Sequence, residues 1–316
     1  MFYLRKLLAG KSSATFTAIG TSILVWVILP LFLNHYWISV LIETLVYGLF
    51  AMGLSVLANY TGLPSLGQAA FFGTGAYALG ISLVRLGQGQ GISVLLSLAA
   101  IIMIAVIFGV LVLQTKGIYF LFITLGLAQI LWAIAWKWQS VTGGDDGLVG
   151  ITRPNLGLSW WNLSTANGFY YFILTIFILA FLALLVIAKS PLGRTFVGVR
   201  ESEVRMSCLG YNVWLHSYFA FIISGFFSGL AGILFAWYNM FVAPQQLSMT
   251  LSAEGLFMGI LGGGTIGGAF LGAVIIVLLK HIASLVTDHW LLVMGAFYII
   301  VIVYMPQGLS SMLQRR

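Results

Sequence analysis

Long uninterrupted runs of apolar residues constrain this sequence more than any other feature. Runs of about 20 residues recur along the whole chain, and 61% of its 316 residues are hydrophobic while 7% carry a charge. As a helix, a run of this length matches the hydrocarbon thickness of a bilayer and satisfies its own backbone hydrogen bonds there. Transmembrane β-barrels show shorter segments of alternating polarity instead. The sequence therefore predicts an all-α integral membrane protein, with residues 1–316 forming one transmembrane domain.

We expect about ten transmembrane helices, covering residues 14–33, 38–58, 65–84, 92–113, 117–136, 168–187, 213–238, 252–263, 266–286 and 290–304. Arg5, Lys6 and Lys11 precede the first span, and basic residues concentrate on the cytoplasmic side of membranes. An even number of spans returns the chain to its starting side, so both termini are predicted to be cytoplasmic. On this topology the loop 188–212 is cytoplasmic and the loop 137–167 is external.

The loop 188–212 is a cluster of charge in an otherwise apolar chain, so it must lie in water. It holds four of the fourteen basic and two of the seven acidic residues: Lys189, Arg194, Arg200, Glu201, Glu203 and Arg205. Ser190-Pro191 predicts the start of a helix and Gly210 predicts its end. Within it, Glu201 and Arg205 have the favourable i,i+4 spacing. The loop is either an ordinary solvated connection or a short amphipathic helix that docks onto a soluble partner.

Two membrane segments, 59–80 and 254–272, are rich in glycine. The first includes Gly67, Gln68, Phe71, Phe72 and Gly75, and the second includes Gly262, Gly263 and Gly264. Small residues allow close helix packing, whereas a broken helix at membrane depth needs surrounding protein or a cavity, as along the substrate path of a transporter. We therefore expect short or broken helices, near the centre of the molecule, that either pack tightly or line a translocation path. No Lys-Ser or Lys-Thr follows the glycines, so a phosphate-binding loop is excluded.

Three further polar features remain. Glu43 and Glu254 lie in apolar runs, where a carboxylate is costly. Each either reaches the lipid headgroups or accepts a hydrogen bond from a substrate ammonium or a partner subunit.

Gly144, Asp145 and Asp146 belong to a turn-rich external stretch, which could be simply solvated. The four histidines are not at metal-binding spacing, no acid–base pair points to an enzyme, and the scattered basic residues do not indicate nucleic-acid binding.

Several motifs occur in an order that resembles permease subunits of bacterial ABC importers, and among these the branched-chain amino acid permeases of the LivM type. They are TGLPSLGQAAFFGTGAY from Thr61, TGGDDGL from Thr142, SPLGR followed by VRESEVRMSCLGYN from Ser190, SGFFSGLAG from Ser224 and EGLFMGILGGGTIGGAFLG from Glu254. The resemblance runs from about Leu41 to the C-terminus. Three positions depart from the family pattern: Gln68 stands where many members have histidine, and Gly198 and Met206 stand where alanine is usual.

The resemblance implies that the loop 188–212 carries a coupling helix that rests in a groove of an ATPase subunit. The residues implied in this contact are Arg194, Arg200, Glu201, Ser202, Glu203 and Arg205, with Gly210 ending the helix. It further implies a second related permease subunit, two ATPase subunits that use ATP, and location in the bacterial cytoplasmic (inner) membrane. A periplasmic or lipid-anchored binding protein would dock near Gly144, Asp145 and Asp146. The chain itself is expected to bind no cofactor or metal.

The expected cargo is a branched-chain or other hydrophobic amino acid. Urea or a short amide is an alternative within the same machinery, and an ATPase-independent secondary transporter or channel is an alternative of another class. The sequence leaves open which residues contact the cargo and whether the segments 59–80 and 254–272 are re-entrant or broken. It also leaves open whether the partner permease is a second copy of this chain.

Overall fold

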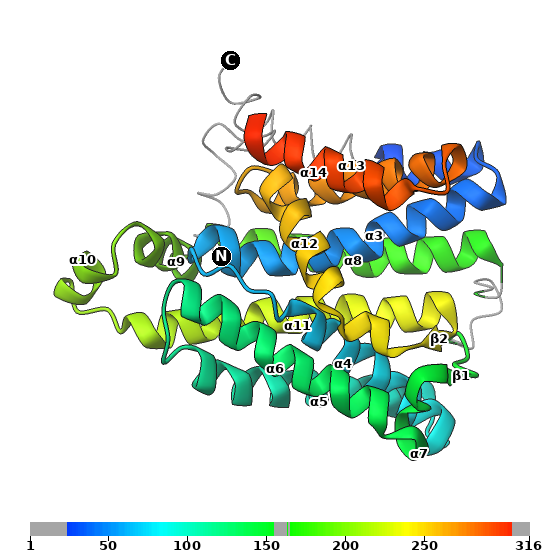
Figure 1. The fold of residues 1–316 in the computed structure, drawn as a ribbon, viewed down its shortest axis with the longest axis horizontal. Coiled ribbons are helices and arrows are strands. Elements are labelled where there is room, and N and C mark those ends of the chain that lie inside the picture. The colour runs from blue at the N-terminus through cyan, green and yellow to red at the C-terminus, as the bar shows by residue number, and fades with distance from the viewer. Residues whose placement is uncertain (1–23, 155–162, 164, 305–316) are drawn as a thin grey trace, which may run out of the picture.

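The computed structural model describes residues 24–154, 163 and 165–304, which form a bundle of helices (Figure 1). Within these residues, six helices are long and apolar enough to cross a membrane. They are α3 with a π-helical last turn (α3 His35–Ser55, turn Val56–Tyr60), α5 (Gln90–Val112), α6 (Ile118–Lys137), α8 (Ala166–Lys189), α11 (Val213–Asn239) and α13 (Ile266–Val286). The last apolar helix is α14 (Trp290–Tyr304). The chain is a multi-pass helical membrane protein.

The predicted spans agree with the observed helices for most of the chain. The boundaries predicted at 38–58, 92–113, 117–136, 168–187, 213–238, 266–286 and 290–304 are confirmed by α3, α5, α6, α8, α11, α13 and α14. Most of the predicted span 14–33 and both termini lie outside the described residues. The total of ten spans and the cytoplasmic placement of the termini therefore stay predictions.

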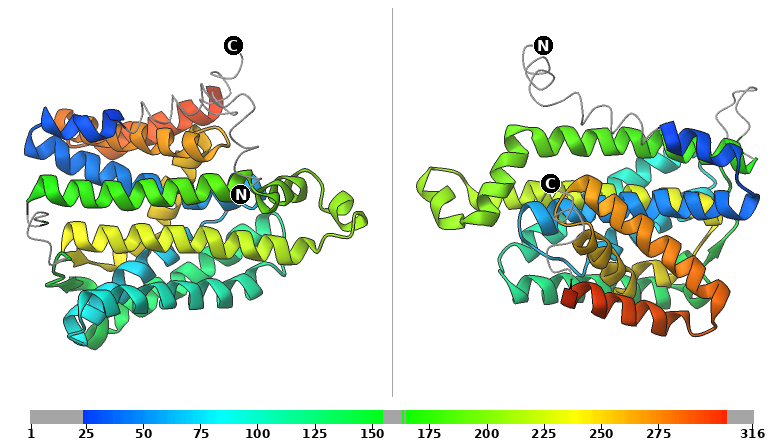
Figure 2. Two further views of the ribbon diagram at one scale, coloured as in Figure 1. Left: turned by 180° about the vertical axis from the view of Figure 1, so that it is seen from behind. Right: turned by 90° about the horizontal axis from the view of Figure 1, so that it is seen from above.

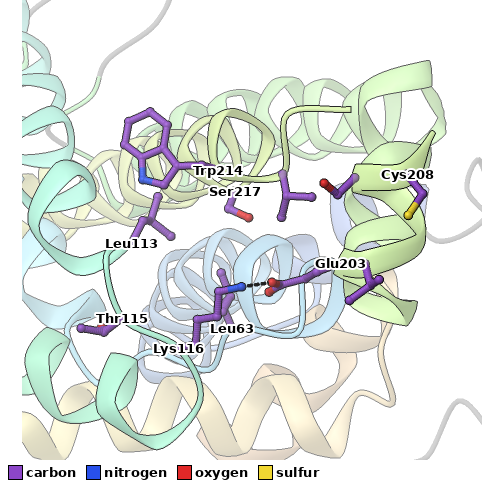
Figure 3. A pocket seen from close by; sticks show the side chains of 11 residues that line it. Leu63, Leu113, Thr115, Lys116, Glu203, Cys208, Trp214 and Ser217 are labelled. Carbon is purple, nitrogen blue, oxygen red and sulfur yellow. Dashed lines mark hydrogen bonds and ion pairs between the residues drawn. The ribbon is translucent and has the colours of Figure 1, made fainter. Parts of the chain in front are cut away.

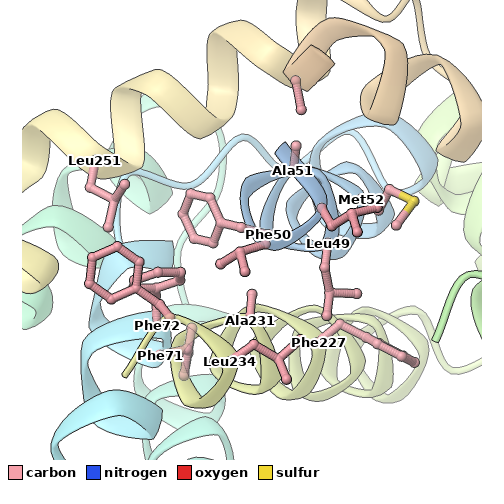
Figure 4. Close-up of a cluster of buried hydrophobic side chains, with 14 of the residues drawn as sticks. Leu49, Phe50, Ala51, Met52, Phe71, Phe72, Phe227, Ala231, Leu234 and Leu251 are labelled. Atoms are coloured by element: carbon pink, nitrogen blue, oxygen red, sulfur yellow. The ribbon is translucent and has the colours of Figure 1, made fainter. Parts of the chain in front are cut away.

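The centre of the bundle is made by α3 and α11. The most apolar stretch of α3 is 94% buried and that of α11 67% buried, whereas the corresponding stretches of α5 and α6 are 22% buried. Figure 4 shows Leu49 and Phe50 of α3 packed with Phe72 of α4 and Leu234 of α11. Apolar side chains such as Leu95 and Phe122 remain exposed on the outer helices. A helix that is apolar on every side but buried on one is suited to contact lipid on the others.

The two glycine-rich segments form short helices, as the sequence predicts. They are α4 (Gln68–Gly80), which continues into a π-helical turn (Ile81–Arg85), and α12 (Met249–Leu261). A non-regular stretch (residues 61–67) leads into α4, and a 3-10 turn (Pro244–Leu247) leads into α12. The first turns of the two helices touch, because the Ala69 amide donates to Ser252 Oγ at 2.9 Å. The predicted spans 65–84 and 252–263 are thus single short helices, each preceded by a stretch that is not α-helical.

The two ends of the bundle differ. At one end, α9 (Pro191–Glu201) and α10 (Glu203–Cys208) project beyond the other helices (Figures 1 and 2); we call this the α9 end. At the opposite end lie α7 (Gln139–Thr142), a 3-10 turn (Gly144–Asp146) and the antiparallel strands β1 (Leu148–Val149) and β2 (Phe241–Val242); we call this the strand end. The strand pair was not predicted, because two residues are too few to show an alternating pattern.

The two short helices point away from each other. At the end of α4, Gly80 packs against Leu148 and Ile151 at the strand end. At the end of α12, the Gly259 carbonyl accepts a hydrogen bond from Asn59 Nδ2 (3.4 Å), and Asn59 is itself bonded to α9. Each segment therefore enters the bundle from one end without an α-helix and leaves as an α-helix towards the other end. Their starts meet in the interior.

Candidate functional site

The start of α9 follows from its sequence. Ser190 Oγ accepts a hydrogen bond from the Gly193 amide at 3.3 Å and Pro191 occupies the first helical position, which confirms the predicted helix start. The helix is amphipathic, with Phe196 and Val199 buried against the bundle while Arg194 is exposed. The charged face of α9 is therefore presented to solvent at the α9 end.

The prediction of one continuous helix with an i,i+4 pair between Glu201 and Arg205 is wrong. The chain leaves the helical conformation at Ser202, with φ −166° and ψ 105°, so Glu201 ends α9 and Arg205 belongs to α10. Ser202 Oγ accepts from the Arg205 amide at 3.2 Å and caps the second helix. A serine hydroxyl competes with the helical hydrogen-bond ladder in this way, and a favourable charge pair does not outweigh it.

The end of α10 agrees with the prediction. Gly210 has φ +85°, a conformation that glycine adopts without strain. The Gly210 amide donates to the Ser207 carbonyl at 3.0 Å, and the Tyr211 amide donates to the Met206 carbonyl at 3.1 Å. These bonds close the last turn, as in helices that end with a left-handed glycine.

Gly198 of α9 and Met206 of α10, the two loop positions that depart from the family pattern, contact each other. A Cβ atom placed on Gly198 would lie 2.7 Å from Met206 Sδ. The longer side chain at position 206 thus fills the space that a methyl group at position 198 would need. The two departures from the family pattern therefore meet in one contact between α9 and α10.

Arg200 ties α9 to the interior of the bundle. Its Nη1 atom donates to the carbonyl of Asn59, in the π-helical turn that ends α3, and its Cγ lies 3.0 Å from the Cβ position of Gly62. The Asn59 amide group in turn donates to Ser55 Oγ (2.9 Å) and to the Gly259 carbonyl of α12 (3.4 Å). One arginine of the exposed segment is therefore connected to α3, to α12 and to the stretch that leads into α4. The sequence did not predict any role for Asn59.

A second contact joins α10 to the bundle. Lys116, in the connection between α5 and α6, forms an ion pair with Glu203 (Figure 3). Both side chains are exposed, by 74% and 36%. Beside them lies a cavity of about 430 Å³, lined among others by Leu63, Leu113, Cys208, Trp214 and Ser217. The cavity separates α10 from the helices beneath it, so α10 is held by few contacts.

The predicted path residues of the first glycine-rich segment lie in the protein interior. Gln68, Phe71 and Phe72 are fully buried on α4. Gln68 Oε1 accepts from Ser228 Oγ of α11 at 3.0 Å, while its Nε2 atom has no partner among the described residues. A Cβ on Gly67 would lie 2.5 Å from the Thr124 carbonyl of α6, and one on Gly75 would overlap the Gly229 carbonyl of α11. These positions serve as helix contacts, and a part in translocation stays a proposal.

The second glycine-rich segment forms the turn between α12 and α13. Gly262 packs directly against the backbone of Gly268, and Gly263 and Gly264 have positive φ angles of 71° and 85°. Residues with side chains rarely adopt such angles, so the reversal between the two helices depends on glycine. The three glycines lie together at the α9 end and do not meet Gly67 or Gly75.

Both carboxylates predicted in apolar runs are paired with basic residues of α13. Glu43 Oε2 of α3 lies 2.8 Å from His281 Nε2, and Glu254 Oε2 of α12 lies 4.0 Å from Lys280 Nζ. All four side chains are mostly buried. The sequence did not predict these partners, although two consecutive basic residues inside an apolar run were visible. Pairing explains how such charges are tolerated in a membrane helix.

The predicted docking residues for a binding protein lie at the strand end. Gly144, Asp145 and Asp146 form a 3-10 turn in which both aspartates are exposed and the Gly144 amide donates to Thr142 Oγ1 at 3.2 Å. They are at the opposite end of the bundle from α9 and α10 (Figure 1). Within the described ranges, no group of three His, Cys, Asp or Glu residues is placed to hold a metal ion.

Comparison with known proteins decides the family. The family model for the permease component of branched-chain amino acid transport systems matches residues 36–302, which covers α4 to α13 in full and all but the outermost residues of α3 and α14. This chain belongs to that family. The resemblance predicted from the motifs is therefore confirmed. No solved structure matches the chain.

Relatives of this branched-chain-type permease include two LivM proteins, named as permeases of high-affinity branched-chain amino acid transport systems. The protein from Salmonella typhimurium is 30% identical and that from Escherichia coli K12 29% identical, each over 90% of this chain and 72% of the relative. A permease of the autoinducer 2 import system, LsrC of Photorhabdus laumondii, is 30% identical over 76% of this chain and 73% of its own length. These homologues are permease subunits of transport systems.

Proposed function

We propose that this chain is a transmembrane subunit of an ATP-driven importer that carries branched-chain or other hydrophobic amino acids across the bacterial cytoplasmic membrane. It would work with a second related permease subunit, two ATPase subunits that hydrolyse the ATP, and a periplasmic or lipid-anchored binding protein. Family membership and the LivM relatives support this proposal.

The observation that carries the proposal is the exposed segment Pro191–Cys208. It projects from the bundle and combines exposed charges with exposed apolar side chains, Val204 at 74% and, just beyond it, Leu209 at 72%. Outside the hydrocarbon, apolar side chains gathered among charges are typical of a protein-binding surface. The ATPase subunit is the expected occupant, with Arg194, Glu201 and Arg205 on the contacting side.

Movement of this segment would reach the bundle through Arg200. Its bond to the Asn59 carbonyl and the bond from Asn59 to Gly259 connect α9 with α12, while the packing of Arg200 over Gly62 connects it with the stretch before α4. ATP-driven closure of the ATPases would pull α9, and the helices would rock around the two glycine-rich segments. A weakly polar path between them suits a small solute without net charge.

The decisive experiment is uptake of radiolabelled L-leucine into liposomes that contain the complete complex, with ATP enclosed and the binding protein added outside. We expect ATP-dependent accumulation that the chain alone does not support. Ion-gradient-driven uptake by the chain alone would overturn the ATPase-driven proposal in favour of a secondary transporter. Uptake by neither preparation would overturn the amino-acid cargo.

The proposed orientation can be tested with single cysteines at positions 146 and 202, in a background where the exposed Cys208 is replaced by serine. In intact cells, Asp146→Cys should react with an impermeant thiol reagent added outside and Ser202→Cys should not. The opposite labelling pattern would place α9 and α10 outside the cell and remove the ATPase from consideration.

A second candidate keeps the machinery and changes the cargo. The LsrC relatives are named as permeases for autoinducer 2 import, so this family also serves solutes other than amino acids. Urea or a short amide would fit the same weakly polar path. The ligand that co-purifies with the cognate binding protein distinguishes these cargoes.

A further inference from the structure

Two pairs of acidic and basic side chains lie in the half of the bundle towards the strand end, and they differ in the distance between their partners. In the first, His281 Nε2 is 2.8 Å from Glu43, and the other ring nitrogen is 3.3 Å from the Tyr36 hydroxyl. In the second, Lys280 Nζ and Glu254 are 4.0 Å apart, and neither side chain makes a hydrogen bond to any described residue. The hydrogen-bonding groups of the first pair therefore have partners among the described residues, whereas those of the second pair do not.

The pair of Glu254 and Lys280, which we call the open pair, includes a residue well inside a helix that is long and apolar enough to cross a membrane. Lys280 comes six residues before the end of α13, which places it about 9 Å inside the helix at 1.5 Å per residue. Charged side chains at this depth face protein or a water-filled space, since lipid cannot solvate them. The side chains of Glu254 and Lys280 keep 19% and 29% of their surface exposed. A solute at this surface of the bundle can therefore reach both side chains.

We infer that Glu254 and Lys280 form a site that recognises the zwitterionic head of an α-amino acid in passage, with Glu254 accepting from its ammonium and Lys280 donating to its carboxylate. This inference rests on the proposed function and adds the residues that select the solute. A carboxylate and an ammonium separated by 4.0 Å offer complementary partners for a molecule that carries both charges on neighbouring atoms. Charge-assisted hydrogen bonds to the solute would replace a contact too long to be one.

Aromatic rings surround the two charges. Lys280 Nζ lies 5.5 Å from the ring centre of Trp290 and 6.0 Å from that of Tyr47, distances at which the rings attract an ammonium. Phe257, three residues after Glu254 on the same side of α12, stacks on Tyr298 of α14 with the ring centres 4.3 Å apart. The rings of Trp290 and Tyr47 stabilise Lys280 when Glu254 binds a solute. All four rings offer apolar surface to a branched aliphatic side chain.

The alternative occupant of this face is the second permease subunit. A subunit interface would bury the pair permanently and would not distinguish small solutes by their charges. A site for a passing solute must distinguish them and must bind weakly enough to release. Comparing solutes that carry both charges, one charge or the other therefore separates the two possibilities.

The test uses the assembled permease–ATPase complex in nanodiscs without the binding protein. Saturation-transfer NMR would compare L-leucine with L-leucinamide, which lacks the carboxylate, and with 4-methylpentanoate, which lacks the ammonium. We expect leucine to bind about tenfold more tightly than either, since each analogue loses a hydrogen bond to a charged group. Lys280→Met should weaken leucine to the level of leucinamide, and Glu254→Gln should weaken it to the level of 4-methylpentanoate.

Glu43→Gln is the matched control, because it makes the same change in the closed pair and should keep the preference for leucine. Lys280→Arg and Glu254→Asp keep the charges and should also keep the preference for leucine. They test the inference even if the neutral variants fail to assemble. Equal binding of the three solutes by the wild-type complex, or an unchanged preference in both neutral variants, would overturn the inference.

Leucine uptake measured on the same preparations separates this inference from the proposed function. Normal ATP-driven uptake of leucine without a preference for the doubly charged solute would contradict the inferred site and support the importer. A preference for the doubly charged solute without uptake of leucine would support the site and contradict the proposed cargo.

Discussion

The contact between α4 and α11 and the attachment of α9 and α10 to the bundle are built in opposite ways. In the first, backbones touch: Gly75 lies on the Gly229 carbonyl, and Gly232 lies on the Phe72 carbonyl. In the second, Phe196 and Val199 anchor α9, and the remaining contacts are single polar ones made by Arg200 and Glu203 beside a cavity of about 430 Å³. Close-packed backbones cannot slide without losing contact, whereas side-chain contacts can shift. We therefore expect α4 and α11 to stay together as one unit, and α9 and α10 to shift more easily relative to the bundle.

The largest effect is expected from Gly75→Leu, which tests the close contact between α4 and α11. Because the Cβ atom itself would overlap the Gly229 carbonyl, the cost should exceed the roughly 1–3 kcal/mol typical of an overfilled core. We expect little monodisperse protein after detergent extraction. Gly267→Leu is the control, since nothing lies within 4 Å of its Cβ position, and it should behave as the wild type. Equal yields and equal thermal midpoints for Gly75→Leu and Gly267→Leu would show that the α4–α11 contact is not tight.

The next largest effect concerns the connection between the two regions. Arg200→Gln removes the donor to the Asn59 carbonyl, and Asn59→Ala removes the donor to Gly259. Arg200→Gln should lower leucine uptake by about tenfold, the equivalent of one hydrogen bond to a charged group, while ATP hydrolysis continues. Asn59→Ala should lower it by roughly fivefold, because its bond to Gly259 joins two neutral groups. The readout is the number of ATP molecules consumed per leucine transported.

Arg194→Gln serves as the control for this prediction. Arg194 is exposed on the same helix, and within the described residues its side chain makes no hydrogen bond. If Arg194→Gln raised the ATP cost per leucine as much as Arg200→Gln, loss of charge at the ATPase surface would explain both, and the connection through Asn59 would be wrong.

A smaller effect is expected inside the projecting segment. Gly198→Ala should destabilise the packing of α9 on α10 by about 1 kcal/mol, because the new methyl group meets Met206 Sδ, an adjustable atom. Met206→Ala in the same chain removes the obstacle, so the double variant should be more stable than the sum of the two changes predicts. Thermal midpoints of the four proteins measure this coupling. Strict additivity would show that the two positions are not in contact in solution.

The smallest effect is expected from the ion pair between Lys116 and Glu203. Both side chains are exposed, and pairs of this kind contribute at most about 1 kcal/mol. Glu203→Gln should therefore leave the thermal midpoint nearly unchanged. The small difference in midpoint between variant and wild type should not depend on salt. A large loss of stability would mean that α10 is held more firmly than its few contacts indicate.

The difference between the two regions also explains what could be predicted from sequence. Glycine at positions 67, 75 and 262–264 indicated short or broken helices, and the structure has them, because the need for small residues and turns is local. The end of α10 at Gly210 was predicted for the same reason. The break at Ser202 was missed, since whether a serine caps a new helix or continues the old one is decided by a competition that one sequence does not resolve.

The sequence by itself determined the family and most helix boundaries, because a helix in lipid must be apolar over a fixed length and the motifs lie close together along the chain. Only the tertiary structure decided which polar groups meet. Glu254 and Lys280 are 26 positions apart, Glu43 and His281 are 238 apart, and Arg200 and Asn59 are 141 apart. Such contacts depend on how the helices pack and rotate against one another, and no local pattern specifies that arrangement.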